Sequence, residues 1–424
     1  MPRSLLKEVV IAGAARTPTG KFVGALAGVP ATELGAVAIR AAIERSGAAA
    51  GDIDYTYMGN MLSAGLGQTP ARQAAVGAGI PATTSAMTVN KACASGLASV
   101  MLAAQAVQLG EADRVVAGGM ENMSAAPHLL MNSRTGQRLG DAKLVDHMIH
   151  DGLWCPFENR HMGGSAEAIA RKFELGRDEL DEFALRSQRR ASAAVAGGEF
   201  DDEIAPVPLP GGGSGTRGGR ERARGGPGKG EQGRGATSDE GSGYLKRDEP
   251  PRADTTIERL RSLKPVFEDT GCVTAGNSSG IADGAAAVVV TSAGAASPPP
   301  STPVARINGY AHAANEPGWL FDAPPAAVAR LLGRTGERIG DFDLIEVNEA
   351  FAAQVVANGR ALGWDLERVN VWGGAIALGH PIGASGARIL VTLLYGLRRT
   401  GGRKGLAVIC HAGGGAMATS VERI

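Results

Sequence analysis

Short apolar runs alternate with longer amphipathic stretches along most of the chain. The runs at 8–16 and 114–120 have the length and residue types of strands. The stretch 32–47 repeats apolar residues at helical spacing and predicts a helix. Alternation of this kind favours sheets covered by helices, so the pattern predicts an α/β fold.

One arrangement occurs twice. Residues 94–119 begin with Ala-Ser-Gly, continue as an apolar helix to Gly110 and lead into a strand-like run. Residues 383–415 follow the same order and end in a glycine-rich turn. Two similar halves that face each other would explain the repeat, although small-residue turns also recur by chance in a chain rich in Ala and Gly.

Residues 122–281, which separate the two repeats, differ in character. They are rich in loops, with one amphipathic region at 165–200 that predicts two helices separated at Gly176. The part at 211–243 contains almost no apolar residue and is predicted to be a disordered insert, because it cannot bury enough surface to order itself. Its basic side chains could contact RNA or phosphates, but a solvated flexible excursion is favoured.

Composition narrows the classes of function. Lys plus Arg and Asp plus Glu number 43 each, so no net field favours nucleic acid or an anionic membrane. The four cysteines lie far apart and form no Cys-x-x-Cys pair, which argues against zinc or a disulfide framework and favours a reducing compartment. We recognise no leader pattern in the sequence. We also recognise no apolar stretch of the roughly 20 residues that a membrane span requires. The sequence predicts a cytoplasmic protein without a metal, a nucleic-acid partner or a membrane.

Cys93 is the first candidate for chemistry, because it stands where a strand-like run gives way to a small-residue helix. A helix that starts there would aim N–H groups at the sulfur, lower its pKa from about 8.5 and supply donors for an oxyanion. This context predicts a thiol placed to attack a carbonyl. Among seven histidines, His380 lies in a glycine-rich stretch ahead of the second Ala-Ser-Gly. Taken alone, Cys410 would be an inert core thiol, and Asn348 with Glu349 would be a helix cap.

Four stretches taken together resemble the active-site blocks of the thiolase family. They are VNKACASG around Cys93, NEAF at 348–351, GGAIALGHPIGASG around His380, and Cys410 ahead of a glycine run. Further segments also resemble thiolase sequences, at 16–26, 118–130, 161–170 and 273–290. The resemblance therefore covers nearly the whole chain apart from 211–243.

The resemblance implies a five-layered α/β/α/β/α sandwich of two similar βαβαβαββ halves with an inserted loop domain. The N-terminal half would comprise 1–121 and 282–300, and the C-terminal half 301–424. The loop domain, 122–281, would cover coenzyme A. The stretch 118–141, which leads into this domain, resembles the inter-subunit loop region of the family, so a homotetramer built as a dimer of dimers is expected.

The resemblance also implies roles for single residues. Cys93 would be the nucleophile that becomes acylated, and His380 would take its proton. Cys410 would then remove a proton from the α-carbon of a second acetyl-CoA. Asn348 would hold a water that, with His380, stabilises the enolate oxygen. No cofactor is implied beyond the coenzyme A thioesters that serve as substrates.

Contacts to the substrate are carried over in the same way. The matching positions for coenzyme A are Leu153, His161, Met162, Arg252, Phe267, Ala275, Ser279, Ala350 and Phe351. The last block departs from the usual Cys-x-Gly, because Ala412 replaces the glycine whose N–H would join that of Cys93 in the oxyanion hole. Alanine tolerates positive φ poorly, so the donor is either Ala412 or Gly413. His411 is expected to face solvent.

The implied activity is acetyl-CoA acetyltransferase, the reversible Claisen condensation of two acetyl-CoA to acetoacetyl-CoA and coenzyme A, with a role in fatty acid metabolism. His161 in the sequence HMG favours the short-chain, biosynthetic type. The nearest alternative is a degradative 3-ketoacyl-CoA thiolase for longer chains. A ketosynthase is disfavoured by Cys410. A non-catalytic acyl-CoA or sterol carrier on the same scaffold is the alternative from another class.

Overall fold

The computed structural model describes residues 7–210, 243–296, 299, 302 and 304–424. The insert predicted at 211–243 lies outside the described residues, except for Gly243. The strands and helices predicted at 8–16, 32–47 and 114–120 are present as β1 (Val9–Arg16), α1 (Ala31–Ser46) and β5 (Arg114–Asn122). Helix α1 ends at Gly47, which adopts φ 72° and ψ 4° and thereby allows the left-handed turn after the helix.

The N-terminal half is built on five strands in the order β1, β12 (Ala282–Ser292), β5, β3 (Tyr55–Gly59) and β4 (Ser85–Val89). Strand β12 runs antiparallel to both β1 and β5, whereas β3 is parallel to β5 and to β4. A two-residue strand, β2 (Gly20–Lys21), also pairs with β12. The outer face packs against α1 and α2 (Pro70–Gly77), so this half has one helical layer outside its sheet.

The C-terminal half repeats this strand order as β13 (Ala305–Ala314), β16 (Gly415–Arg423), β15 (Lys404–His411) and β14 (Leu344–Val347). The fifth position holds a single bridge between Ile345 and Val369 in place of a strand. Helices α7 (Ala323–Thr335) and α8 (Ala352–Leu362) pack on the outer face. The matching orders confirm the two similar halves, which meet where two residue pairs join β1 to β13.

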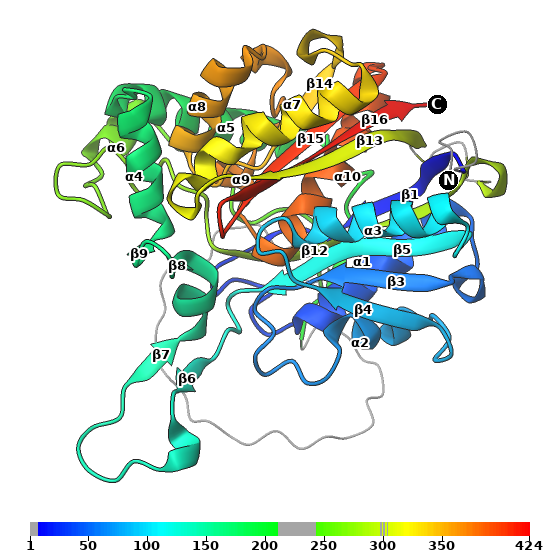
Figure 1. Cartoon of the computed structure of the whole chain (residues 1–424), viewed down its shortest axis with the longest axis horizontal. Coiled ribbons are helices and arrows are strands. Elements are labelled where there is room, and N and C mark those ends of the chain that lie inside the picture. Colours follow the sequence, from blue (N-terminus) through cyan, green and yellow to red (C-terminus); the bar gives the residue numbers. More distant parts are fainter. Residues whose placement is uncertain (1–6, 211–242, 297–298, 300–301, 303) are drawn as a thin grey trace.

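Two helices, α3 (Ser95–Leu109) and α10 (Ile382–Thr400), lie between the two sheets and contribute to one shared core. They approach closely because glycines face each other: a Cβ on Gly386 would lie 2.6 Å from the backbone nitrogen of Leu97, and one on Gly96 would lie 2.8 Å from that of Ala387. The layers are thus α1 with α2, the N-terminal sheet, α3 with α10, the C-terminal sheet, and α7 with α8 (Figure 1). This confirms the predicted five-layered sandwich. The apolar stretch 92–109 has the length and hydropathy of a membrane span, but 67 % of it is buried inside the protein, as in a core helix.

The segment between β5 and β12 forms small paired strands and helices beside the sandwich. An arm made of β6 and β7 extends away from the body (Figure 1). Helix α5 begins directly after Gly176, where the sequence predicts the break between two helices. The elements are β6 (His128–Leu130), β7 (Leu144–Asp146), β8 (Trp154–Cys155), β9 (Arg160–His161), α4 (Met162–Lys172), α5 (Arg177–Gly197), β10 (Val207–Pro208), β11 (Tyr244–Leu245) and α6 (Ile257–Ser262).

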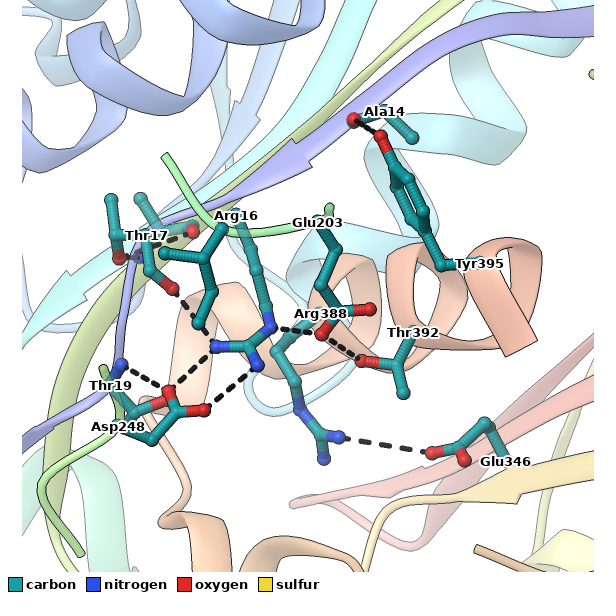
Figure 2. Close-up of polar contacts among 12 residues, drawn as sticks. Ala14, Arg16, Thr17, Thr19, Glu203, Asp248, Glu346, Arg388, Thr392 and Tyr395 are labelled. Atoms are coloured by element: carbon teal, nitrogen blue, oxygen red, sulfur yellow. Dashed lines mark hydrogen bonds and ion pairs between the residues drawn. The ribbon is translucent and has the colours of Figure 1, made fainter. Parts of the chain in front are cut away.

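A buried cluster of charges fastens this segment to both halves (Figure 2). The Arg16 guanidinium, at the end of β1, donates to Glu203 and, at 2.7 and 2.9 Å, to both carboxylate oxygens of Asp248. Thr392 of α10 donates to the same Glu203 oxygen at 3.0 Å. Glu203 precedes the insert in sequence and Asp248 follows it, so Arg16 fixes the chain before and after the insert. Removing one partner would leave a buried charge uncompensated, which is strongly destabilising.

Candidate active site

The three reactive side chains predicted from the sequence meet at one cavity of about 290 Å³. Cys93 comes from the turn before α3, His380 from the turn before α10 and Cys410 from the end of β15. The walls also include eight other residues named by the sequence analysis: Leu153, His161, Met162, Phe267, Ser279, Ala350, Phe351 and Ala412.

Four predicted residues do not line this cavity. Asn348 is fully buried, whereas Arg252, Ala275 and Gly413 are exposed. Conversely, the sequence analysis did not name nine residues that do line it: Met123, Gly152, Val266, Ser278, Gly280, Ile281, Leu320, Phe321 and Ile382. Ser278 to Ile281 lie within a segment that resembles the family, but Leu320 and Phe321 follow β13 in a stretch without any motif.

The turn that carries Cys93 is strained and fixed by a neighbouring hydroxyl. Ala92 adopts φ 48°, a left-handed conformation that is uncommon for a residue with a Cβ. The Ser95 hydroxyl accepts from the N–H of Lys91 at 2.8 Å and donates to the carbonyl of Ala92 at 2.6 Å. The turn therefore presents the sulfur to the cavity with little freedom.

The expectation of a lowered pKa for Cys93 is wrong for the free protein. Burial raises the pKa of this thiol to about 11, and the nearby Glu121 carboxylate adds to the rise. The backbone N–H groups of Ala412 and of Cys93 itself hydrogen-bond toward the sulfur and lower the pKa, but they do not outweigh burial. The free protein therefore holds Cys93 as a neutral thiol near neutral pH.

This raised pKa predicts a steep pH dependence for alkylation of Cys93. Only the thiolate reacts, so the rate of modification by iodoacetamide should rise about tenfold per pH unit between pH 6 and pH 9. The measurement is the loss of unmodified Cys93 by peptide mass spectrometry at each pH. A rate that is flat across this range would mean that the thiolate already forms at pH 6.

His380, which lines the cavity, is held as a neutral imidazole with one free ring nitrogen. Ser385 donates its single hydroxyl hydrogen to the carbonyl of Pro381 at 2.9 Å, so it accepts from His380 Nδ1, 2.5 Å away. Nε2 then carries the lone pair, and it has no hydrogen-bond partner in the described part of the chain. Burial and the positive charge of Arg388 lower the pKa of His380 to about 3, which keeps the ring neutral.

Asn348, two residues before the cavity-lining Ala350, carries a buried amide whose polar atoms are unused. Its side chain is fully buried, yet neither Oδ1 nor Nδ2 has a partner among the described residues. Its backbone is fixed by the N–H donating to the carbonyl of Val408 on β15 at 2.9 Å. Buried amides are normally satisfied, so these atoms are suited to hold a small polar ligand such as a water.

The glycine-rich turn after Cys410 accommodates Ala412 without positive φ. Gly413 and Gly414 have φ of 87° and 91°, but Ala412 is not among the described non-glycine residues with positive φ. Its methyl group is therefore compatible with the turn, and its N–H faces the Cys93 sulfur. His411 does not face solvent but is half-buried and lines the cavity, with Nδ1 2.8 Å from the Ala412 carbonyl.

Comparison with known proteins identifies the family. The model of the thiolase N-terminal domain matches residues 9–222 and 229–294, and that of the thiolase C-terminal domain matches 301–423. The chain belongs to the thiolase family. A protein named acetyl-CoA acetyltransferase from Pseudomonas aeruginosa is 49% identical over 99% of this chain and 100% of its own. One of the same name from Cupriavidus necator is 50% identical with the same coverage.

The fold of this thiolase is also shared with a solved structure. The crystal structure of the Bacillus anthracis acetyl-CoA acetyltransferase superposes with a TM-score of 0.88 and 37% sequence identity. The match covers 99% of this chain and 100% of the other. The loop segments beside the sandwich are thus included in the likeness as well as the two halves.

Proposed function

We propose that this protein is an acetyl-CoA acetyltransferase that condenses two acetyl-CoA reversibly to acetoacetyl-CoA and coenzyme A. The observation that carries the proposal is the meeting of two thiols and one neutral imidazole at a single cavity. Relatives about half identical to the chain carry that name. A carrier without catalysis would have no use for this arrangement of reactive groups.

In the first half of the reaction, the Cys93 sulfur attacks the thioester carbonyl and His380 Nε2 takes its proton. The carbonyl oxygen becomes an oxyanion, to which the N–H groups of Cys93 and Ala412 donate. Collapse of this intermediate expels coenzyme A as a thiolate, which receives the proton from His380. The acetyl group remains on Cys93.

In the second half, Cys410 takes a proton from the α-carbon of another acetyl-CoA. The negative charge moves onto the thioester oxygen, where His380 and a water held by Asn348 stabilise it. The α-carbon then attacks the acetyl group on Cys93, and the sulfur leaves. Burial and the ionisable sulfur of Cys93 raise the pKa of Cys410, so acetylation of Cys93 removes one obstacle to its ionisation.

A preference for short chains is part of this proposal. His161 stacks on Phe267 with 4.9 Å between ring centroids, and its Nδ1 accepts from the N–H of Gly163 at 3.1 Å. Its Nε2–H is then the donor left for a substrate at the cavity wall. This supports recognition of a small, polar 3-ketoacyl group.

The test is a chain-length profile in the direction of thiolysis. With coenzyme A in excess, kcat/KM for acetoacetyl-CoA should exceed that for a ten-carbon 3-ketoacyl-CoA by about tenfold or more. A preference for the longer substrate would indicate the degradative type. Absence of turnover with both substrates would instead favour a carrier.

We also propose a homotetramer built as a dimer of dimers. The arm at 128–146, which extends away from the body of the protein (Figure 1), supports this because it exposes apolar side chains. Leu139 is 93% exposed, and Met131 and Leu144 are 50% and 60% exposed. Exposed apolar groups gathered on an extended arm favour contact with another subunit.

A further inference from the structure

The segment that carries His380 is held on both sides by buried carboxylates outside the cavity wall. It runs from Gly373 through the single helical turn α9 (Ala375–Leu378) to the start of α10. Glu349 contacts the part before His380, and Glu121 contacts the part after it. Neither carboxylate is needed for the chemical steps proposed above.

Glu349 follows Asn348 directly and binds the start of the segment. Its Oε2 accepts from the N–H of Ile376 at 3.1 Å and from the Ser187 hydroxyl at 2.7 Å. That hydroxyl in turn accepts from the N–H of Gly374 at 3.1 Å. A Cβ on Gly374 would lie 2.3 Å from the Glu349 carboxyl carbon, so this close approach requires glycine.

The other oxygen of Glu349 ties the same carboxylate to β14. Oε1 accepts from Asn370 Nδ2 at 2.8 Å, and Asn370 also exchanges two hydrogen bonds with the backbone of Val347. One side chain therefore sets the position of Asn348, through its backbone and β14, relative to the turn that carries His380. Both residues have unpartnered buried polar atoms, and the proposed mechanism assigns them to the enolate oxygen and its water.

Glu121, at the end of β5, fixes the segment from the opposite side. Its Oε2 accepts from the N–H of Gly383 in the first turn of α10 at 2.8 Å. The carboxylate also accepts from the backbone of Met61 and Leu62 and from Asn60 Nδ2. It thus joins the N-terminal half to the C-terminal half a few residues from His380, where a negative charge also suits a helix N-terminus.

We propose that Glu349 and Glu121 are positioning residues that hold His380 in register with Asn348 and Cys93. Their effect on the reaction passes through backbone N–H groups and not through contact with substrate. The inference rests on the proposed function, because it assigns a purpose to the geometry of His380. Each oxygen of both carboxylates accepts from a donor, so an amide in their place must turn its NH₂ against a donor on one side.

The experiment compares Glu349→Gln and Glu121→Gln with the wild type in acetoacetyl-CoA thiolysis. We expect kcat to fall by about 10- to 100-fold in each, because small displacements of a catalytic group cost this much, while KM for coenzyme A stays within about twofold. Ser187→Ala removes the hydroxyl that bridges Glu349 Oε2 and the N–H of Gly374, and it should lower kcat in the same sense. It keeps the test decisive should a carboxylate variant fail to fold.

Glu203→Gln is the matched control. Glu203 is also fully buried and accepts from Arg16 and Thr392 (Figure 2). Neither of these partners belongs to the segment from Gly373 to the start of α10 that carries His380. The Glu203→Gln substitution should lower the melting temperature and leave kcat within about twofold of the wild type. Equal kcat in Ser187→Ala, in the folded carboxylate variants and in this control would overturn the positioning role. A wild type without thiolysis would overturn the proposed function first, so the two failures are distinguishable.

Discussion

Cys93→Ser eliminates the acetyl-enzyme and lowers turnover by about 10³-fold or more. A serine hydroxyl ionises far less readily than a thiol near neutral pH, and the imidazole proposed to take its proton has a lowered pKa. Oxygen is also a poorer leaving group than sulfur when the acetyl group must move to the second substrate. The measurement is the mass of the intact protein after incubation with acetyl-CoA, followed by the rate of thiolysis.

Cys272→Ser is the control for a change of sulfur to oxygen elsewhere in the chain. Cys272 does not line the cavity, and its side chain donates to Glu167 at 3.4 Å, a bond that a hydroxyl can replace. This variant should acetylate and turn over like the wild type. An acetyl group found on Cys93→Ser at any other side chain in the cavity would show that the nucleophile has been misassigned.

The sequence predicts the two-fold repeat of the fold because small residues mark it at equivalent places. Ala-Ser-Gly precedes both core helices, and the structure explains why: Gly96 and Gly386 lie where the two helices approach within contact of their backbones. The strands can be predicted from short apolar runs because both faces of each sheet are covered, which makes most strand residues apolar. The reduced strand at Val369 could not be predicted, because one bridge leaves no periodic pattern.

The reactive residues are predicted better than their environments. Motifs locate Cys93, His380 and Cys410, but the pKa of each depends on how much of the protein surrounds it. A helix N-terminus suggests a lowered thiol pKa, whereas the structure buries the sulfur so deeply that burial dominates. Residues that reach the cavity from unrelated segments, such as Leu320 and Phe321, carry no local signal at all.

The sequence also underestimates Glu349. An acidic residue after a strand commonly caps the next helix, and this is the ordinary interpretation of NEAF taken alone. The structure gives Glu349 three hydrogen-bond partners, of which Ile376 and Ser187 belong to other elements. Only the tertiary fold brings these together, so no spacing rule along the chain could identify the contact.

Cys410→Ala should separate the two halves of the reaction. Cys93, His380 and the N–H groups around the sulfur remain, so acetylation by acetyl-CoA should proceed within about tenfold of the wild-type rate. Condensation should fall by about 10³-fold or more, because the substitution removes the base that takes the α-proton in the proposed mechanism. The residue is buried and small, so alanine fits with little rearrangement.

Two readouts follow the two halves separately. Intact mass reports the acetyl group on Cys93, and incubation with acetyl-CoA in D₂O reports exchange at the α-carbon. We expect a normal acetyl adduct and loss of exchange. If Cys410→Ala still exchanged α-protons at the wild-type rate, the base would be a different group, and His380, whose neutral Nε2 faces the same space, would be the next to replace.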